Sequence, residues 1–173
     1  MAVSATQALN LKIPPHSHEA ESAVLGTLMT DNSAWEKIGD LIGPEDFYKP
    51  EHKLIYQNIV KLIERSKVAD VVTVSEAMKS YNSGSGFVGI EYLNGLAESS
   101  PAVDNIKGHA EIIRDQSILR RLVSVSQEIS TLAFTPSKRD TRVLLDEAEQ
   151  KIFKISEDRA RGNSGLKNFD SLL

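Results

Sequence analysis

Six residues from Gly84 to Gly89 match G-x-G-x-x-G, a spacing that can bind the pyrophosphate of a dinucleotide. That chemistry needs a β-strand before the glycines and a helix after them, because the helix N-terminus and backbone N–H groups hold the phosphates. In this chain a helical pattern precedes the glycines and no strands alternate around them, so we interpret the match as a loop. The chain also lacks a G-x-x-x-x-G-K-[ST] phosphate loop, and we therefore expect it not to hydrolyse ATP.

The pair His16 and His18, followed by Glu19 and Glu21, could ligate a metal ion. A zinc site needs three or four convergent ligands, with outer hydrogen bonds that orient them. Capping explains these residues better, because Ser17 is a good N-cap and negative charge is favourable in the first turn of a helix. The other two histidines are each isolated on a predicted helix, where we expect them to be solvated or hydrogen-bonded. Since no G-x-S-x-G nucleophile elbow occurs either, we predict no catalytic, cofactor-binding or metal-ligating residue.

The composition is that of a protein with an ordinary hydrophobic core: 40% of the 173 residues are hydrophobic. No residue is cysteine, which excludes disulfides and cysteine-ligated zinc. No segment approaches the roughly 20 apolar residues of a membrane span, and the N-terminus lacks the pattern of a signal peptide, so we expect a cytoplasmic protein. The net charge is −4, made up of −5 in residues 1–100 (8 Lys/Arg, 13 Asp/Glu) and +1 in residues 101–173 (12 and 11). Because nucleic-acid binders concentrate positive charge, we expect little direct DNA binding.

The elements that carry these residues are predicted to be helices, in an all-α fold. Residues 1–12 are predicted to be a flexible N-terminal tail, and residues 13–100 a globular subdomain of about five to six short helices. Apolar residues recur at helical spacing within residues 20–29, 35–41, 54–63, 74–81 and 90–97. Pro50 suits the first position of a helix, and Thr73–Glu76 matches a capping box.

Residues 101–160 are predicted to form a long antiparallel helical hairpin that serves oligomerisation. The first helix is predicted from about Val103 to Phe134, and a turn containing Pro136 leads into the second. Each helix carries an apolar row at heptad spacing, which favours helix-on-helix packing. The rows are Ile118, Leu122, Val125, Ile129 and Leu132 on the first helix, and Leu145, Ala148, Ile152 and Ile155 on the second; Leu119, Val123, Leu144 and Phe153 lie off them. Two helices alone cannot bury two apolar faces, so the second face packs either on the globule or on another copy of the hairpin.

Charged residues of the hairpin have two interpretations. Such residues usually form the solvated faces of helices, but they could also form a docking surface. The candidates are Arg120, Arg121, Glu128, Lys138, Arg139 and Glu147. Residues 161–173 begin with a Gly/Ser-containing stretch that is typical of a flexible linker.

Three stretches of the chain resemble DnaB-type replicative DNA helicases. They are Ile13–Glu21 (IPPHSHEAE) with Val24–Met29 and Asp31-Asn32; Asp46–Tyr48 with His52 and Leu54–Tyr56; and Asp70–Ala77 (DVVTVSEA). The order and spacing agree with the family, and the opening stretch is highly specific. The similarity continues to Lys151–Ile155 and covers roughly residues 11–170, with a local departure at Ser83–Gly89.

The resemblance implies a non-catalytic N-terminal domain, in which a helical globule carries a hairpin that pairs with the hairpin of a neighbouring subunit. In this family three such dimers form a collar on a hexameric ring, and primase docks on the collar through its C-terminal region. The six charged residues above would then be candidate primase contacts, and a helicase loader would be a further candidate partner. Residues 161–173 would lead to a RecA-like motor domain that binds ATP and Mg²⁺, whereas this fragment would bind no cofactor.

The alternative is a stand-alone helical adaptor or helicase-loader-like protein without a motor. The gene sequence beyond Leu173 separates the two hypotheses. A phosphate-loop motif supports the helicase, and a stop codon supports the adaptor.

Overall fold

The computed structural model describes residues 13–81, 88–100, 105–135 and 140–164, with side chains up to residue 160. Every regular element in this part of the chain is a helix, which confirms the predicted all-α fold. In chain order, with η for a 3-10 helix, the elements are α1 (His18–Thr30), η1 (Asn32–Lys37), η2 (Pro44–Asp46), α2 (Pro50–Glu64), α3 (Val71–Met78), η3 (Lys79–Tyr81), α4 (Ile90–Glu98), α5 (Ile106–Phe134) and α6 (Thr141–Ser164).

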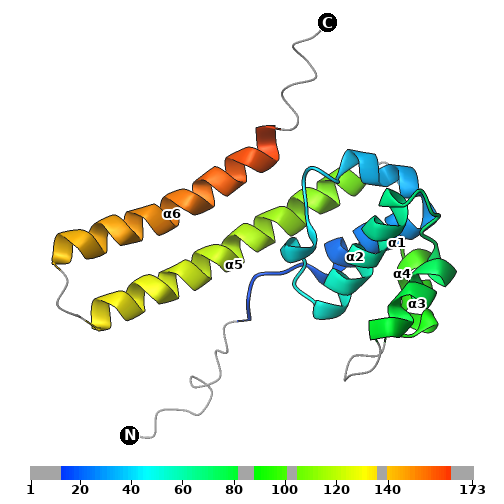
Figure 1. The fold of residues 1–173 in the computed structure, drawn as a ribbon, viewed down its shortest axis with the longest axis horizontal. Coiled ribbons are helices and arrows are strands. Elements are labelled where there is room, and N and C mark those ends of the chain that lie inside the picture. The colour runs from blue at the N-terminus through cyan, green and yellow to red at the C-terminus, as the bar shows by residue number, and fades with distance from the viewer. Residues whose placement is uncertain (1–12, 82–87, 101–104, 136–139, 165–173) are drawn as a thin grey trace, which may run out of the picture.

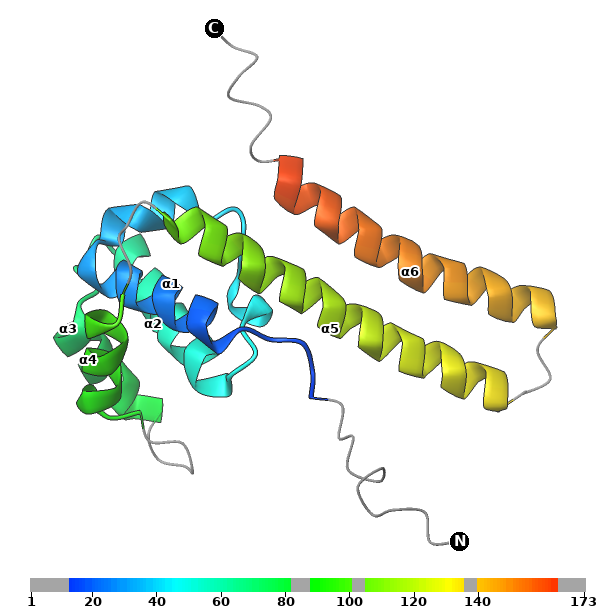
Figure 2. The same ribbon diagram turned by 180° about the vertical axis from the view of Figure 1, so that it is seen from behind.

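The chain forms a helical globule from which two long helices project. Helices α1 to α4 and the first part of α5 lie together at one end of the molecule, as Figures 1 and 2 show from opposite sides. Beyond the globule α5 continues outward and α6 returns beside it in the opposite direction. The described residues therefore have the shape of a globule with an antiparallel hairpin.

Helix α1 begins where the sequence predicted it. Ser17 is the N-cap, and its Oγ accepts a hydrogen bond of 3.2 Å from the backbone N–H of Ala20. The helix buries most of its side chains, because it packs against α2, α4 and α5. Gly26 lies so close to α4 that a Cβ atom at this position would stand 2.0 Å from the carbonyl oxygen of Leu96. The first helix is thus central to the globule.

The predicted capping box at Thr73–Glu76 is wrong. Helix α3 begins at Val71, and its N-cap is Asp70, whose carboxylate accepts a 2.8 Å hydrogen bond from the Thr73 N–H. The Thr73 hydroxyl in turn accepts a 2.9 Å bond from the Asp70 N–H. The carboxylate of Asp70 is a strong N-cap acceptor, so the helix starts three residues earlier than predicted.

Two boundaries of the hairpin also differ from the prediction. Helix α5 begins at Ile106 rather than Val103, and α6 continues to Ser164, four residues into the predicted linker. Most of the predicted glycine loop lies outside the described residues, but Gly89 is the N-cap residue of α4.

The globule has one core, to which α1, η1, α2, α3, α4 and α5 contribute and α6 does not. Two rings at its centre, Phe47 and Tyr56, lie 4.8 Å apart, and the Tyr56 hydroxyl donates a 3.1 Å hydrogen bond to the carbonyl of Ile42. Burial raises the pKa of Tyr56 to about 12. The largest fully buried side chains are Tyr56, Phe47, Leu25, Leu28, Ile38, Ile55, Ile59, Met78, Leu93, Ile106, Ile113 and His52.

Candidate interaction surface

The first three turns of α5 are rooted in the globule. Ile106, Ala110 and Ile113 on this helix belong to the buried core. Ser117 is its last buried residue, and from there to Phe134 every described side chain is half-buried or exposed. Beyond Ser117 the hairpin is therefore a continuation of a core helix that leaves the globule.

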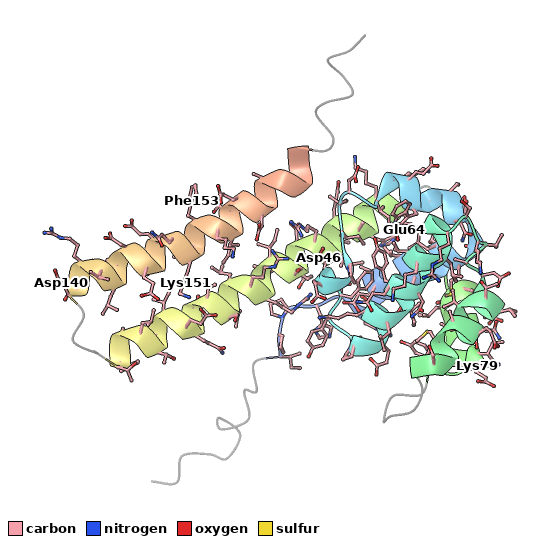
Figure 3. All side chains as sticks on the ribbon, in the orientation of Figure 1. Asp46, Glu64, Lys79, Asp140, Lys151 and Phe153 are labelled. Carbon is pink, nitrogen blue, oxygen red and sulfur yellow. The ribbon has the colours of Figure 1, made fainter. Side chains whose placement is uncertain are left out.

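A group of charged residues joins the hairpin to the globule, and we call it the arginine junction: Asp46, Arg114, Arg120, Arg121 and Asp158. Asp46 is only 3% exposed, and Arg114 donates to its carboxylate at 3.1 Å. Arg121 lies 3.2 Å from Asp158 on α6 and 3.7 Å from Asp46. Figure 3 shows Asp46 beside the part of α5 that leaves the globule. The junction thus connects η2, α5 and α6.

Arg120 holds the segment that precedes α1. Its guanidinium donates 2.8 Å to the carbonyl of Pro15, also bonds the Asp46 carbonyl, and lies over the Tyr48 ring with 5.6 Å to the ring centroid. Burial lowers the pKa of Arg120, although the nearby carboxylates of Glu21 and Asp46 oppose this shift. Arg120 and Arg121 were candidate docking residues in the sequence. Both make internal contacts in the structure, and that either one contacts a partner stays a prediction.

The remaining docking candidates lie farther along the hairpin. Glu128 on α5 pairs with Lys151 on α6 at 2.7 Å. Glu147 is half-buried beside this pair, in the groove between the helices. Lys138 and Arg139 lie outside the described residues. That Glu128, Glu147, Lys138 or Arg139 contacts a partner stays a prediction.

The thirteen apolar residues predicted for hairpin packing and the oligomer interface divide into two sets. Seven are half-buried: Ile118, Val125, Ile129, Leu132, Leu144, Ala148 and Ile155. Six are exposed by 42% to 63%: Leu119, Leu122, Val123, Leu145, Ile152 and Phe153. Figure 3 shows Lys151 pointing towards α5 and Phe153 on the opposite side of α6.

The register of the seam between the helices differs from the prediction. Leu122, Leu145 and Ile152 were predicted on the packed rows, but they are 42%, 60% and 48% exposed. Leu144 is turned inward instead, and Lys151 follows it one heptad later. Sequence reasoning passed over this row because it contains a lysine. The lysine is accommodated because its ammonium group pairs with the carboxylate of Glu128 across the seam.

The hairpin consequently has one apolar side, which we call the apolar face: Leu122, Ile129, Leu145, Ala148 and Ile152. In a helix of 3.6 residues per turn, each residue is rotated by about 100° about the helix axis from the residue before it. A residue that follows an inward-facing one therefore points sideways from the hairpin. Because α5 and α6 run antiparallel, this rotation points to the same side of the hairpin on both helices. The other side carries polar residues, which line a groove of about 410 Å³: Ser124, Gln127, Glu128, Thr131, Glu147 and Lys151, with Leu132 at its base.

A buried polar cluster in the globule was missed by sequence reasoning. The imidazole of His52 is fully buried, with Nδ1 2.6 Å from the carboxylate of Glu21 and Nε2 2.7 Å from the hydroxyl of Tyr92. Glu21 also accepts a hydrogen bond from the Tyr48 N–H. Burial raises the pKa of Glu21, but the hydrogen bonds from His52 and Tyr48 outweigh it and hold the pKa below its usual value.

This cluster connects α1, α2 and α4, and its groups satisfy one another. The expectation that an isolated histidine would be hydrogen-bonded is confirmed for His52. In the sequence, only the presence of a glutamate and a histidine pointed to this cluster, because His52 lies 31 residues from Glu21 and 40 residues from Tyr92. Within the described ranges no three His, Cys, Asp or Glu residues are grouped to hold a metal ion. None of the helices described is long and apolar enough to span a membrane.

Comparison with known proteins identifies relatives of this architecture. The family model for the DnaB-like helicase N terminal domain matches residues 13–115. The replicative DNA helicase DnaB of Pasteurella multocida (strain Pm70) is 37% identical over 161 residues, which are 93% of this chain and 34% of that protein. The chain thus spans about a third of the length of such curated relatives.

Two solved structures agree with the family match. The crystal structure of the N-terminal domain of DnaB helicase from Mycobacterium tuberculosis has a TM-score of 0.74 and 27% identity, over 82% of this chain and 99% of that one. The N-terminal domain of DnaB helicase from Helicobacter pylori has a TM-score of 0.59 and 26% identity, over 68% and 91% of the two chains. Sequence and fold lead to the same assignment, and the chain belongs to the DnaB-like helicase N-terminal domain family.

Proposed function

We propose that this chain is a scaffold module of a replicative DNA helicase, and that it joins copies of itself through the apolar face of the hairpin. The observation that carries the proposal is the position of Leu122, Leu145 and Ile152. These side chains lie on one side of the hairpin and remain 42% to 60% exposed. Among the described elements α6 packs mainly on α5, and the exposure of these side chains shows that the globule does not cover them.

A second copy of the hairpin suits this face for a physical reason. Burial of a leucine or isoleucine side chain stabilises an association by roughly 1.5–3 kcal/mol. Symmetric dimers use the same patch on both partners, so that each exposed residue is buried twice per dimer. A face with large apolar side chains at heptad spacing is self-complementary in this sense.

Self-association is tested by size-exclusion chromatography with light scattering on the variants Leu122→Asp and Ile152→Asp. Each variant removes apolar burial and adds a charge, and a loss of about 3 kcal/mol weakens a dimer at least 100-fold. Thr131→Asp is the matched control, because Thr131 is exposed and lines the polar groove on the other side of the hairpin. Folded Leu122 and Ile152 variants that associate as strongly as the control variant would contradict the proposal.

The parent protein would be an ATP-dependent, cytoplasmic DNA helicase, and its motor domain would bind ATP and Mg²⁺. We further propose that the hairpin docks the C-terminal region of primase. The Helicobacter pylori relative was solved as an N-terminal domain together with its interactions with primase, which supports this partner. Three dimers would form the collar of a hexamer.

Primase docking is tested by isothermal titration of the primase C-terminal region into this chain. Glu128 and Glu147 line the polar groove that stays open when the apolar face is covered. We expect Glu128→Lys and Glu147→Lys to weaken binding at least tenfold, while Glu76→Lys on α3, far along the chain from the hairpin, leaves it unchanged. Absence of heat at high micromolar concentrations would contradict the docking proposal and leave the self-association result untouched.

A further inference from the structure

The C-terminal half of α6 is held to the globule by polar contacts. The Arg121 guanidinium lies 3.2 Å from the carboxylate of Asp158, and Arg114 donates 2.7 Å to the Asp158 backbone carbonyl. The last inward apolar residue of α6 is Ile155, three residues earlier. The end of α6 therefore depends on Asp158 rather than on a packed apolar contact.

The contacts at this point have an inner and an outer layer. In the inner layer, the side chains of Arg114 and Asp46 are 17% and 4% exposed. In the outer layer, the side chains of Arg121 and Asp158 are 36% and 34% exposed. Ion pairs in contact with solvent are weaker and are screened by salt, whereas a buried pair is costly to break. The outer layer is the part that can open.

A polar pocket lies beneath the outer layer. It has a volume of about 460 Å³ and is bounded by the loop of residues 39–43 together with Arg114, Arg121 and Asp158. Apolar side chains do not fill the joint, so movement of α6 here would expose little of the core. Local opening is easiest where few apolar contacts are lost.

Arg121 has an alternative partner if Asp158 moves away. Its guanidinium is 3.7 Å from the Asp46 carboxylate in the closed arrangement. If Asp158 moves away, the carboxylate of Asp46 therefore still compensates the charge of Arg121. An element with two satisfied arrangements is what a conformational switch requires.

We propose that Arg121 and Asp158 form a releasable latch that fixes the C-terminal half of α6 to the arginine junction, so that a movement of α6 is transmitted through Arg121 to Asp46. Closing the latch fixes the direction of α6 relative to α5. Opening it breaks the Arg121–Asp158 pair and the Arg114 hydrogen bond to the Asp158 carbonyl, and α6 can then move while the Arg114–Asp46 pair keeps α5 in place. The latch lies in the arginine junction, away from the apolar face, and so does not depend on self-association.

The absence of cysteine allows the test to be made by site-directed spin labelling. Cysteines are introduced at Glu64 on α2 and Glu157 on α6, which are both exposed. Double electron–electron resonance then measures the distance between the two labels, in protein diluted with an unlabelled copy so that only distances within one chain contribute. With the latch closed we expect a single narrow distance distribution.

Asp158→Ala and Arg121→Gln are each expected to broaden this distribution at least twofold or to add a second, longer distance. The matched control is Asp146→Ala, which removes an exposed aspartate from the same helix and should leave the distribution narrow. Unmutated protein in about 1 M salt should move towards the Asp158→Ala result, because a Debye length of about 3 Å screens the exposed pair.

Either latch variant with a distribution as narrow as that of the unmutated protein overturns the proposal, as does a distribution unaffected by salt. Circular dichroism confirms that each variant is folded before the distances are compared, and the salt series requires no substitution. Light scattering on Asp158→Ala should give the same association as the unmutated chain. Failure of the latch is thereby distinguished from failure of the proposed self-association.

Discussion

Substitution of Gly26 by alanine tests how closely α1 and α4 approach. A Cβ atom at Gly26 would lie 2.0 Å from the Leu96 carbonyl oxygen, 2.8 Å from its carbonyl carbon and 3.1 Å from the Ser100 Cβ. Two of these three atoms belong to the backbone, so no flexible side chain can move aside. The helices must therefore separate, which also strains the 2.8 Å hydrogen bond between the hydroxyls of Thr27 and Ser100.

The magnitude follows from two opposing effects. Overpacking in a close-packed core costs about 1–3 kcal/mol and occasionally more, and a backbone clash of this depth belongs at the upper end. Replacing glycine by alanine inside a helix gains about 1 kcal/mol of helix propensity. The net loss for Gly26→Ala is then about 2 kcal/mol or more, which lowers the melting temperature of a domain this size by about 4–8 °C.

Gly95→Ala on the neighbouring helix α4 is the matched control. A Cβ atom at Gly95 would meet no other atom within 4 Å, so only the propensity gain remains and stability should rise by up to about 1 kcal/mol. Thermal unfolding followed by circular dichroism compares the two variants with the unmutated chain. If Gly26→Ala raises the melting temperature as Gly95→Ala does, the reasoning about the α1–α4 contact is refuted.

Two further predictions concern the polar groups of the globule. Because the folded-state pKa of Glu21 lies below the ordinary 4.5, its stabilising contribution is complete above about pH 4.5 and is lost as the pH falls through the folded pKa. Glu21→Gln should lower the free energy of unfolding, measured in urea at pH 7, by roughly 1.5–3 kcal/mol. This difference from the unmutated chain should shrink by pH 3. A difference that stays constant with pH would argue against the role of the Glu21 carboxylate. Asp70→Ala should cost about 1 kcal/mol through loss of the α3 N-cap, and Thr73→Ala should lose part of the same free energy. If Asp70→Ala is as stable as the unmutated chain, Asp70 does not cap α3, and Thr73 is the N-cap instead.

Short-range features of the fold could be predicted from the sequence. Ser17 with its following glutamates marked the start of α1, since an N-cap bond spans only three residues. The hairpin followed from two long apolar rows joined by a short turn. The cap of α3 was misplaced because the Thr73–Glu76 pattern was preferred to Asp70, although aspartate is the stronger N-cap residue. The Thr73 hydroxyl does not cap a later helix and donates instead to the Val68 carbonyl at 2.8 Å.

The register of the hairpin seam could not be predicted because α6 offers two adjacent rows with equal spacing. One row has leucine and isoleucine at Leu145 and Ile152, and the other has Leu144 and Lys151. An apolar criterion selects the first row. In the structure the second row faces α5, where Lys151 forms an ion pair with Glu128, and the first row stays exposed. Under the proposed self-association, a second copy of the hairpin would cover this exposed row.

The arginine junction was the largest omission, and the reason lies in sequence distance. Asp46 and Arg114 are 68 residues apart, and Arg121 and Asp158 are 37 apart, so no local pattern links them. Adjacent arginines on a long helix are usually solvated, which made the surface interpretation of Arg120 and Arg121 reasonable. The printed contacts that tie α6 to the junction lie at Asp158, near the C-terminal end of α6. The exposed Arg121–Asp158 pair connects the two parts in a defined geometry, and at about 0–1 kcal/mol it costs less to break than the burial of a leucine side chain, at about 1.5–3 kcal/mol.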